Sequence, residues 1–178
     1  MIQSDETGTS AKQRSMCYRG FADAFRGSGT PGDNQASPQS EIGLGAFIAA
    51  FDPAVSNVAC SLHESSYIKR AQSDLFMELL RWYDYFGLRR SPDAQLPDHV
   101  SVELEFMHFL TFQEHENLHD TEIVLAMRRA QKDFLSRHLM PLASAIQEAC
   151  QSDDEGCVGL VADLPDFLTE DLRLLNAD

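Results

Sequence analysis

The chain has 178 residues, a length that corresponds to one domain with a single hydrophobic core. Hydrophobic residues make up 43% of it and charged residues 24%, which is a globular composition and argues against disorder over the whole length. Its 14 Lys and Arg against 28 Asp and Glu give a net charge of −14. This charge argues against general binding to a nucleic-acid backbone and favours cations, basic peptides or basic protein surfaces as ligands.

The sequence shows no sign of export or membrane insertion. No run of 18 apolar residues is present, and the polar segment 1–12 lacks the apolar stretch of a signal peptide. We therefore expect a cytoplasmic protein. Its four cysteines have no metal-binding spacing and are expected to be reduced thiols, mostly in the core: Cys17, Cys60, Cys150 and Cys157.

Leucine is more frequent than valine and isoleucine together, and alternating extended runs are absent. These features predict an all-α, single-domain helical bundle over residues 1–178. We expect residues 1–10 to be flexible and a first helix over 10–25. The following segment, 27–40, is rich in Gly, Pro, Ser, Asn and Gln and is expected to be a flexible loop. A short apolar segment, 42–51, comes next.

A third helix is predicted by apolar residues that recur on one helical face: Leu75, Leu79, Trp82 and Phe86. Gly87 stands where a glycine typically ends a helix. The start of this helix is open. Ser61 with Glu64 fits a capping box, and Ser65 is an equally suitable first residue.

A central helix is expected to begin at residues 96–99 and to run toward His115. Pro97 and Asp98 favour a helix start, because proline suits the first turn and an aspartate complements the helix dipole. Apolar residues around much of its circumference indicate a helix in the middle of the fold.

The last third of the chain is also predicted to be helical. Asp120 can cap the next helix, which Pro141 ends or restarts. The segment 157–175 is expected to hold one or two short helices interrupted by Pro165.

Residues 115–119 read His-Glu-Asn-Leu-His, which is the H-E-x-x-H spacing of zinc proteases. Two imidazoles one helical turn apart can bind zinc, and the glutamate can activate a zinc-bound water. The third ligand of the extended motif is absent, and the pair falls at a predicted helix end. A chance cluster is therefore favoured, and a zinc-dependent hydrolase using His115, Glu116 and His119 is the alternative.

The stretch from Pro97 to Met107 carries the most specific pattern in the chain. Pro-Asp-His stands at the predicted helix start, and Leu-Glu-x-Met follows at residues 104–107. The stretch resembles the hallmark of the TorD/DmsD/NarJ family, the dedicated cytoplasmic chaperones of molybdenum enzymes. Weaker similarities to this family are spread along the chain: Arg14-x-x-x-Tyr18, a Ser-x-Tyr at 65–67, an aromatic helix end at 82–88, and Phe-Leu-x-x-His-Leu at 134–139.

Two segments, 60–67 and 83–88, are similar to one branch of this family. That branch serves the dehydrogenases of ethylbenzene and dimethyl sulfide and the reductases of chlorate and selenate. In the loop where chaperones of DMSO reductase have a tryptophan-glycine pair, this chain has His63-Glu64. The loop contacts of those relatives are therefore not carried over.

The resemblance implies a TorD-like helical chaperone that is not an enzyme and has no cofactor of its own. Its partner would be the precursor of the catalytic subunit of a molybdopterin oxidoreductase, including the twin-arginine signal peptide. The chaperone would assist cofactor insertion before export, as a monomer or a homodimer. An acidic helical adaptor with an unrelated partner is the remaining alternative.

The residues expected to bind this partner are these: Ser65, Tyr67, Trp82, Tyr83, Phe86, Pro97, Asp98, His99 and Glu105. Asp98 and His99 would form a groove edge where a carboxylate could hold an arginine, or they would only start the helix. Glu105 would lie on the same side of that helix as Asp98. The aromatic cluster could line an apolar groove, although its residue types favour the core.

Overall fold

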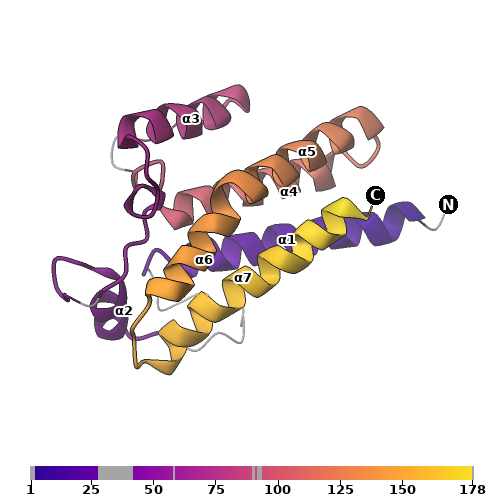
Figure 1. Ribbon diagram of the computed structural model, residues 1–178. Coiled ribbons are helices and arrows are strands. Elements are labelled where there is room, and N and C mark those ends of the chain that lie inside the picture. The colour runs from indigo at the N-terminus through magenta and orange to yellow at the C-terminus, as the bar shows by residue number, and fades with distance from the viewer. Residues whose placement is uncertain (1–2, 28–41, 58, 90, 92–93, 178) are drawn as a thin grey trace.

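The computed structural model describes residues 3–27, 42–57, 59–89, 91 and 94–177. All regular structure in this part of the chain is helical, which confirms the predicted all-α class (Figure 1). The helices are α1 (Gln3–Ala24), α2 (Leu44–Phe51), α3 (Gln72–Tyr85), α4 (Val100–Glu116), α5 (Thr121–Phe134), α6 (Met140–Ala149) and α7 (Glu155–Asn176). A 3-10 turn, Glu64–Ser66, and a π-helical turn, Leu135–Leu139, complete the set.

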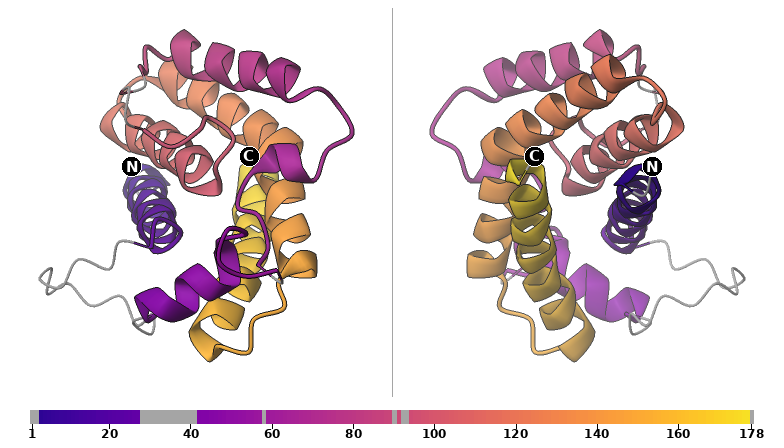
Figure 2. Two further views of the ribbon diagram at one scale, coloured as in Figure 1. Left: turned by 90° about the vertical axis from the view of Figure 1, so that its left-hand side faces the viewer. Right: turned by 90° about the vertical axis from the view of Figure 1, so that its right-hand side faces the viewer.

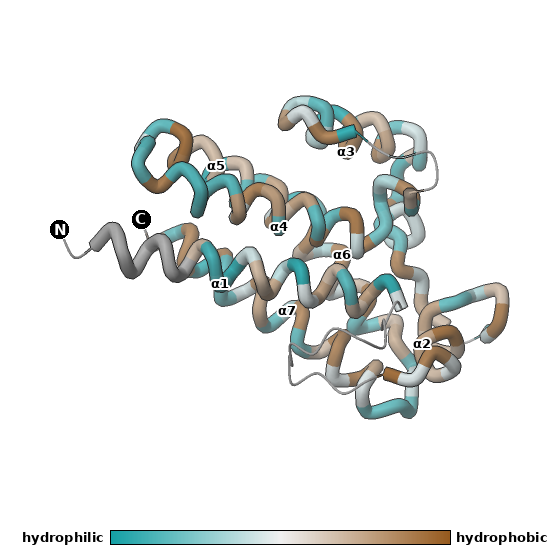
Figure 3. The backbone as a smooth tube through the Cα atoms, turned by 180° about the vertical axis from the view of Figure 1, so that it is seen from behind, coloured by the Kyte–Doolittle hydropathy of each residue, from teal (hydrophilic) through white to brown (hydrophobic). Residues whose placement is uncertain are grey.

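Helix α4 is central, as its sequence predicts. It lies along α1 on one side and packs against α5 on the other, while α7 runs beside α6 and contacts α1 (Figure 1). Helix α3 covers the outer side of α4 and α5, and α2 lies at the opposite end next to α7 (Figure 2). Figure 3 shows that α2 is largely apolar, in agreement with its sequence LGAFIAAF.

Several predicted helix boundaries agree with the structure. The Asp120 side chain accepts hydrogen bonds from the first amides of α5, as expected of a cap. Pro141 lies in the first turn of α6, after a π-helical turn that continues from α5. Gly87 follows α3 with a φ of 74°, in the left-handed region that favours glycine.

Three predicted boundaries are wrong. Helix α1 begins at Gln3, inside the segment expected to be flexible, and not at residue 10. Helix α3 begins at Gln72 and at neither proposed serine, because the residues around Ser65 form a separate turn bonded to the segment before α4. Helix α7 continues through Pro165, since its buried apolar face extends on both sides of the proline. Of the loop predicted at 27–40, residues 28–40 lie outside the described residues.

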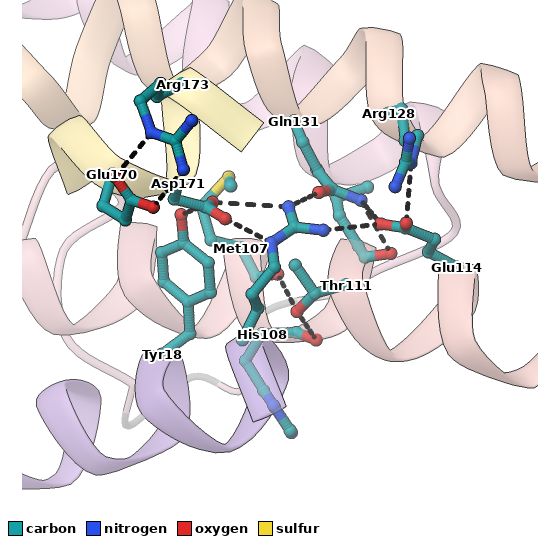
Figure 4. A network of polar contacts seen from close by, with 12 residues as sticks. Tyr18, Met107, His108, Thr111, Glu114, Arg128, Gln131, Glu170, Asp171 and Arg173 are labelled. Atoms are coloured by element: carbon teal, nitrogen blue, oxygen red, sulfur yellow. Dashed lines mark hydrogen bonds and ion pairs between the residues drawn. The ribbon is translucent and has the colours of Figure 1, made fainter. Parts of the chain in front are cut away.

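A buried guanidinium joins four helices. Arg14 of α1 lies between carboxylates of α4 and α7, with Nη1 3.0 Å from Glu114 Oε2 and Nη2 3.3 Å from Asp171 Oδ2 (Figure 4). Its Nε also donates to Asp171, and Nη2 donates to Gln131 of α5. Burial alone would lower the pKa of Arg14, but the two carboxylates raise it. The arginine is therefore charged, and its charge compensates the buried acids.

The same network explains the Arg14-x-x-x-Tyr18 pattern. Arg14 and Tyr18 lie one helical turn apart on α1, and both donate to Asp171. Figure 4 shows the Tyr18 hydroxyl bonded to the Asp171 carboxylate, whose Oδ2 accepts the hydrogen bond. Burial, together with Asp171, raises the pKa of Tyr18 well above its ordinary value, so the hydroxyl stays a donor. On the other side, Arg128 Nε lies 2.8 Å from Glu114 Oε1. Two arginines and two carboxylates thus balance in charge.

Replacing Arg14 should destabilise the fold strongly. Arg14→Leu leaves two buried carboxylates without their main partner, so the free energy of unfolding should fall by about 3–5 kcal/mol. Arg19→Leu is the matched control on the same helix, since Arg19 makes an exposed pair with Asp23 that contributes about 1 kcal/mol at most. Urea denaturation of both variants tests the difference. Equal losses would show that the Arg14 network does not stabilise the fold.

Candidate functional site

Two segments that are far apart in sequence meet at the start of α4. His63, which follows α2 in the chain, pairs with His99 in a short antiparallel bridge. The Glu64 amide donates to the Asp98 carbonyl at 2.9 Å. On the other side of the histidine pair, the Val100 amide donates to the Leu62 carbonyl, also at 2.9 Å. The Pro-Asp-His stretch is therefore bound along its backbone to the loop before α3.

The Asp98 side chain is fully buried beneath this bridge. His63 Nδ1 lies 3.0 Å from Asp98 Oδ1, and the Ser65 amide donates to Oδ2 at 3.1 Å. Burial would raise the pKa of Asp98, but these bonds from His63 and Ser65 outweigh it and lower the pKa. Asp98 is thus an anion that positions His63. Its burial does not fit the predicted direct contact with an arginine of a ligand.

His99 caps α4. Its Nδ1 accepts a hydrogen bond from the Ser101 amide at 3.2 Å and lies 2.8 Å from Ser101 Oγ. Burial, followed by the neighbouring His63 and Arg26, lowers the pKa of His99 to about 4. The ring is therefore neutral at pH 7. Because Nδ1 accepts the amide proton, the ring proton is on Nε2, which is a hydrogen-bond donor.

A groove of about 350 Å³ opens beside the two histidines, between the end of α1, helix α2 and the bridged segments. Its apolar lining is rich in phenylalanine: Phe25, Phe47, Ile48, Phe51, Pro53 and Leu62. Its polar lining residues are Arg26, Asp52, Ser61, His63, Gln95 and His99. Gly27, with a φ of 65°, follows the end of α1. A Cβ atom at this position would come within 2.9 Å of the Phe47 ring. The close packing of Phe47 thus depends on this glycine.

The structure gathers five of the predicted residues around this groove. His99 lines it directly, and Asp98 and the Ser65 amide hold His63 in place. The Tyr67 hydroxyl donates to the Ser61 carbonyl at 2.7 Å and so closes the loop that carries His63. Pro97 is buried, and its carbonyl accepts a 2.8 Å hydrogen bond from the Tyr83 hydroxyl.

The predicted aromatic cluster has a different place. Trp82 packs against Phe106 and Phe134, with ring centroids 6.2 and 5.7 Å apart, and Phe86 packs 5.6 Å from Phe106. Tyr83 is buried among the same rings. None of Trp82, Tyr83 and Phe86 lines the groove. Tyr83 thus belongs to the core, and Trp82 and Phe86 pack against it half-buried. The predicted role of these three residues in partner binding stays a prediction.

Glu105 does not face Asp98. Its carboxylate forms an ion pair with Arg26 at the end of α1. Glu105 does not line the groove, but its partner Arg26 does. Sequence reasoning missed Arg26, His63 and the phenylalanines of α2. The uninterrupted apolar run of α2 was the available signal, because a short helix that is apolar all round must be covered on several sides.

The H-E-x-x-H pattern does not form a metal site. Helix α4 ends at Glu116, and Asn117 caps it, so the exposed His119 lies beyond the helix that carries His115. The two imidazoles are therefore not one turn apart on a continuous helix. Among the described residues there is no group of three or more side chains that could hold a metal ion. The zinc-hydrolase alternative is not supported.

Within the described ranges, no helix combines the length and apolar character needed to cross a membrane.

A family model described as the nitrate reductase delta subunit matches residues 44–147, which include α2, the bridged segments and the whole of α4. The chain belongs to the nitrate reductase delta subunit family. This result confirms the resemblance to the TorD/DmsD/NarJ chaperones, and the matched residues include all of the groove lining except Phe25 and Arg26. The match covers more than half of the chain.

Named relatives agree with the predicted branch. The selenate reductase assembly chaperone protein of Thauera selenatis is 38% identical over 95 residues, covering 52% of this chain and 49% of the relative. The chlorate reductase assembly chaperone protein of Ideonella dechloratans is 34% identical over 95 residues, with the same coverage of 52% and 49%. The dimethyl sulfide dehydrogenase assembly chaperone protein of Rhodovulum sulfidophilum is 28% identical over 137 residues, covering 71% and 55%. The chain spans about half the length of the curated relatives it matches.

The positioning role of Asp98 can be tested through stability. Asp98→Ala leaves the Ser65 amide and His63 without their acceptor, so the free energy of unfolding at pH 7 should fall by about 1–3 kcal/mol. Because the pKa of Asp98 is lowered in the fold, its stabilisation is present above the ordinary value of 3.8 and is lost as the pH falls through the folded-state pKa. The difference in free energy of unfolding between the wild type and Asp98→Ala should therefore become smaller in acid.

Urea denaturation at several pH values measures this difference in free energy of unfolding. The control is Asp163→Ala, at an exposed position of α7. A loss of stability in Asp98→Ala that does not change with pH would show that the buried carboxylate is not the cause of that loss.

Proposed function

We propose that this chain is a chaperone for the catalytic subunit of a molybdopterin-containing oxidoreductase. It binds the precursor of that subunit in the cytoplasm, including its twin-arginine signal peptide, and assists cofactor insertion and assembly before export. The family and the names of its relatives as assembly chaperones support this function. The chaperone uses no cofactor of its own and catalyses no reaction.

One observation carries the assignment of the binding site: the groove lies directly against the Pro-Asp-His stretch. Its floor is formed by Phe25, Phe47 and Phe51, which suit the apolar part of a signal peptide. Asp52 is the carboxylate in its lining. The net charge of −14 adds a field that attracts the basic start of such a peptide.

The two histidines give the groove its hydrogen-bonding character. His99 presents a neutral Nε2–H donor, and His63 is held by Asp98 through Nδ1, so that its own Nε2 is the remaining polar atom of the ring. Their rings are 5.0 Å apart and nearly perpendicular. Such an edge suits the backbone amides of an extended peptide that crosses the groove.

The peptide-binding role can be tested with a groove residue and a matched phenylalanine. Phe47→Ala removes a half-buried ring from the groove, and a lost apolar contact of about 1.5–3 kcal/mol should weaken binding of a twin-arginine signal peptide by about ten- to a hundredfold. Phe112→Ala, at an exposed site of α4, should leave the affinity unchanged. Calorimetric titration measures the affinities, and thermal melting of each free variant reports on folding.

Equal affinities of both variants, with a folded Phe47→Ala protein, would exclude the groove as the peptide site. A peptide in which both arginines are glutamine serves as a second ligand. If it bound like the native peptide, the acidic charge of the chain would have no part in recognition. Absence of binding to any signal peptide or precursor would favour the acidic adaptor.

A further inference from the structure

Three titratable side chains lie together in the core behind the bridge. Glu64 comes from the 3-10 turn that follows His63, Glu103 from the first turn of α4, and His138 from the π-helical turn. Their exposed fractions are 3%, 0% and 1%. The groove and the folding network around Arg14 use none of these three groups.

The histidine binds only one of the two glutamates. His138 Nδ1 lies 3.1 and 3.3 Å from the two carboxylate oxygens of Glu64. His138 Nε2 lies 3.4 Å from Glu78 Oε1 of α3, outside hydrogen-bonding geometry. The imidazole donates no hydrogen bond to Glu103.

Glu103 has no hydrogen-bond donor of its own. With both carboxyl groups ionised, neither of its oxygens finds a partner among the described residues, although both oxygens are buried. An ionised carboxylate in such a place would carry a large desolvation cost. Burial is the main cause that raises the pKa of Glu103 well above its ordinary value, and the nearby carboxylates of Glu64 and Asp98 raise it further. The protonated form can donate its O–H to the Glu64 carboxylate.

We propose that Glu103 and Glu64 bind one proton between them, and that this proton holds the segment carrying His63 against α4. The Glu103 hydroxyl donates to Glu64, whose other contact is His138. Loss of the proton to solvent leaves two buried carboxylates that repel each other. Glu64 would then move away, and its backbone bond to Asp98 would carry the strain to the groove.

No other charged group described around Glu103 and Glu64 takes over the role of this proton, because each has a partner of its own. Asp98 already accepts from His63 and Ser65, and Glu78 is paired with Arg70 of the preceding loop. The proton site itself does not depend on the proposed function. Its effect on ligand binding rests on that function and is the last step of the test.

Infrared spectroscopy of the full chain at pH 7 detects the proton directly. The wild type should show the carbonyl stretch of a protonated, buried carboxylic acid at a pH where exposed carboxyl groups are ionised. Glu103→Gln should lack this band, and Glu116→Gln, at an exposed site of the same helix, should keep it. Absence of the band from the wild type would overturn the proposal, whatever the variants do.

Thermal melting against pH is the second readout. Because the pKa of Glu103 is raised in the fold, its protonated form contributes stability that is fully present below the ordinary value of 4.5. This stability is lost as the pH rises through the folded-state pKa. Between about pH 5 and about pH 9, the melting temperature of Glu103→Gln should therefore fall less than that of the wild type, and Glu116→Gln should follow the wild type. Parallel curves for the wild type and Glu103→Gln would contradict the shared proton.

Peptide titration over the same pH range separates the two proposals. With a bound signal peptide, the affinity of the wild type should fall toward high pH, and that of Glu103→Gln should not. If the infrared band and the melting curves behave as expected but no peptide binds, the proposed function fails and the proton site stands. If the peptide binds with the same pH dependence in both proteins, the link from the proton to the groove is wrong.

Discussion

The guanidinium of Arg14 compensates the buried carboxylates of Glu114 and Asp171, and it thereby determines how α1 lies against α4 and α7. A buried acid that loses its partner is costly, so the helices can approach only in the arrangement that brings the arginine between them. The end of α1 carries Phe25 and Arg26, which line the groove. The position of one side of the groove is thus a consequence of a charge balance around the middle of the same helix.

The opposite side of the groove depends on a second buried anion. Asp98 precedes α4 and accepts hydrogen bonds from His63 and from the Ser65 amide, so the loop before α3 is fixed to the start of the central helix. The hallmark stretch therefore acts from beneath the surface. Its aspartate positions a histidine of another segment, and its own histidine caps the helix and lines the groove. Under the proposed function, substitution at Asp98 alters ligand binding through the position of His63 and not through a direct contact to the ligand.

Helical periodicity predicted the fold class and most helix positions, because apolar faces and caps such as Asp120 are local signals. It failed where distant contacts decide the outcome. Ser61 and Glu64 fit a capping box, yet Glu64 turns inward to His138 and α3 begins only at Gln72. For the proposed site, the pattern indicated the stretch that lies against the groove but not which of its side chains are buried. His63 was missed because its bridge to His99, and not the chain around it, brings it to the groove. Phe47 was missed because the groove forms only where α2 meets the end of α1, a contact that the local sequence does not show.

The central claim of the proposed function is that the precursor of a catalytic subunit occupies the groove beside His63 and His99. Amide hydrogen exchange of the chaperone, with and without the bound precursor of a molybdopterin catalytic subunit, tests this claim most directly. We expect bound precursor to slow exchange in α2 and in residues 59–66 and 94–99, and to leave exchange on the outer face of α7 unchanged. Slower exchange confined to α5 and α7, with no change at the groove, would contradict it.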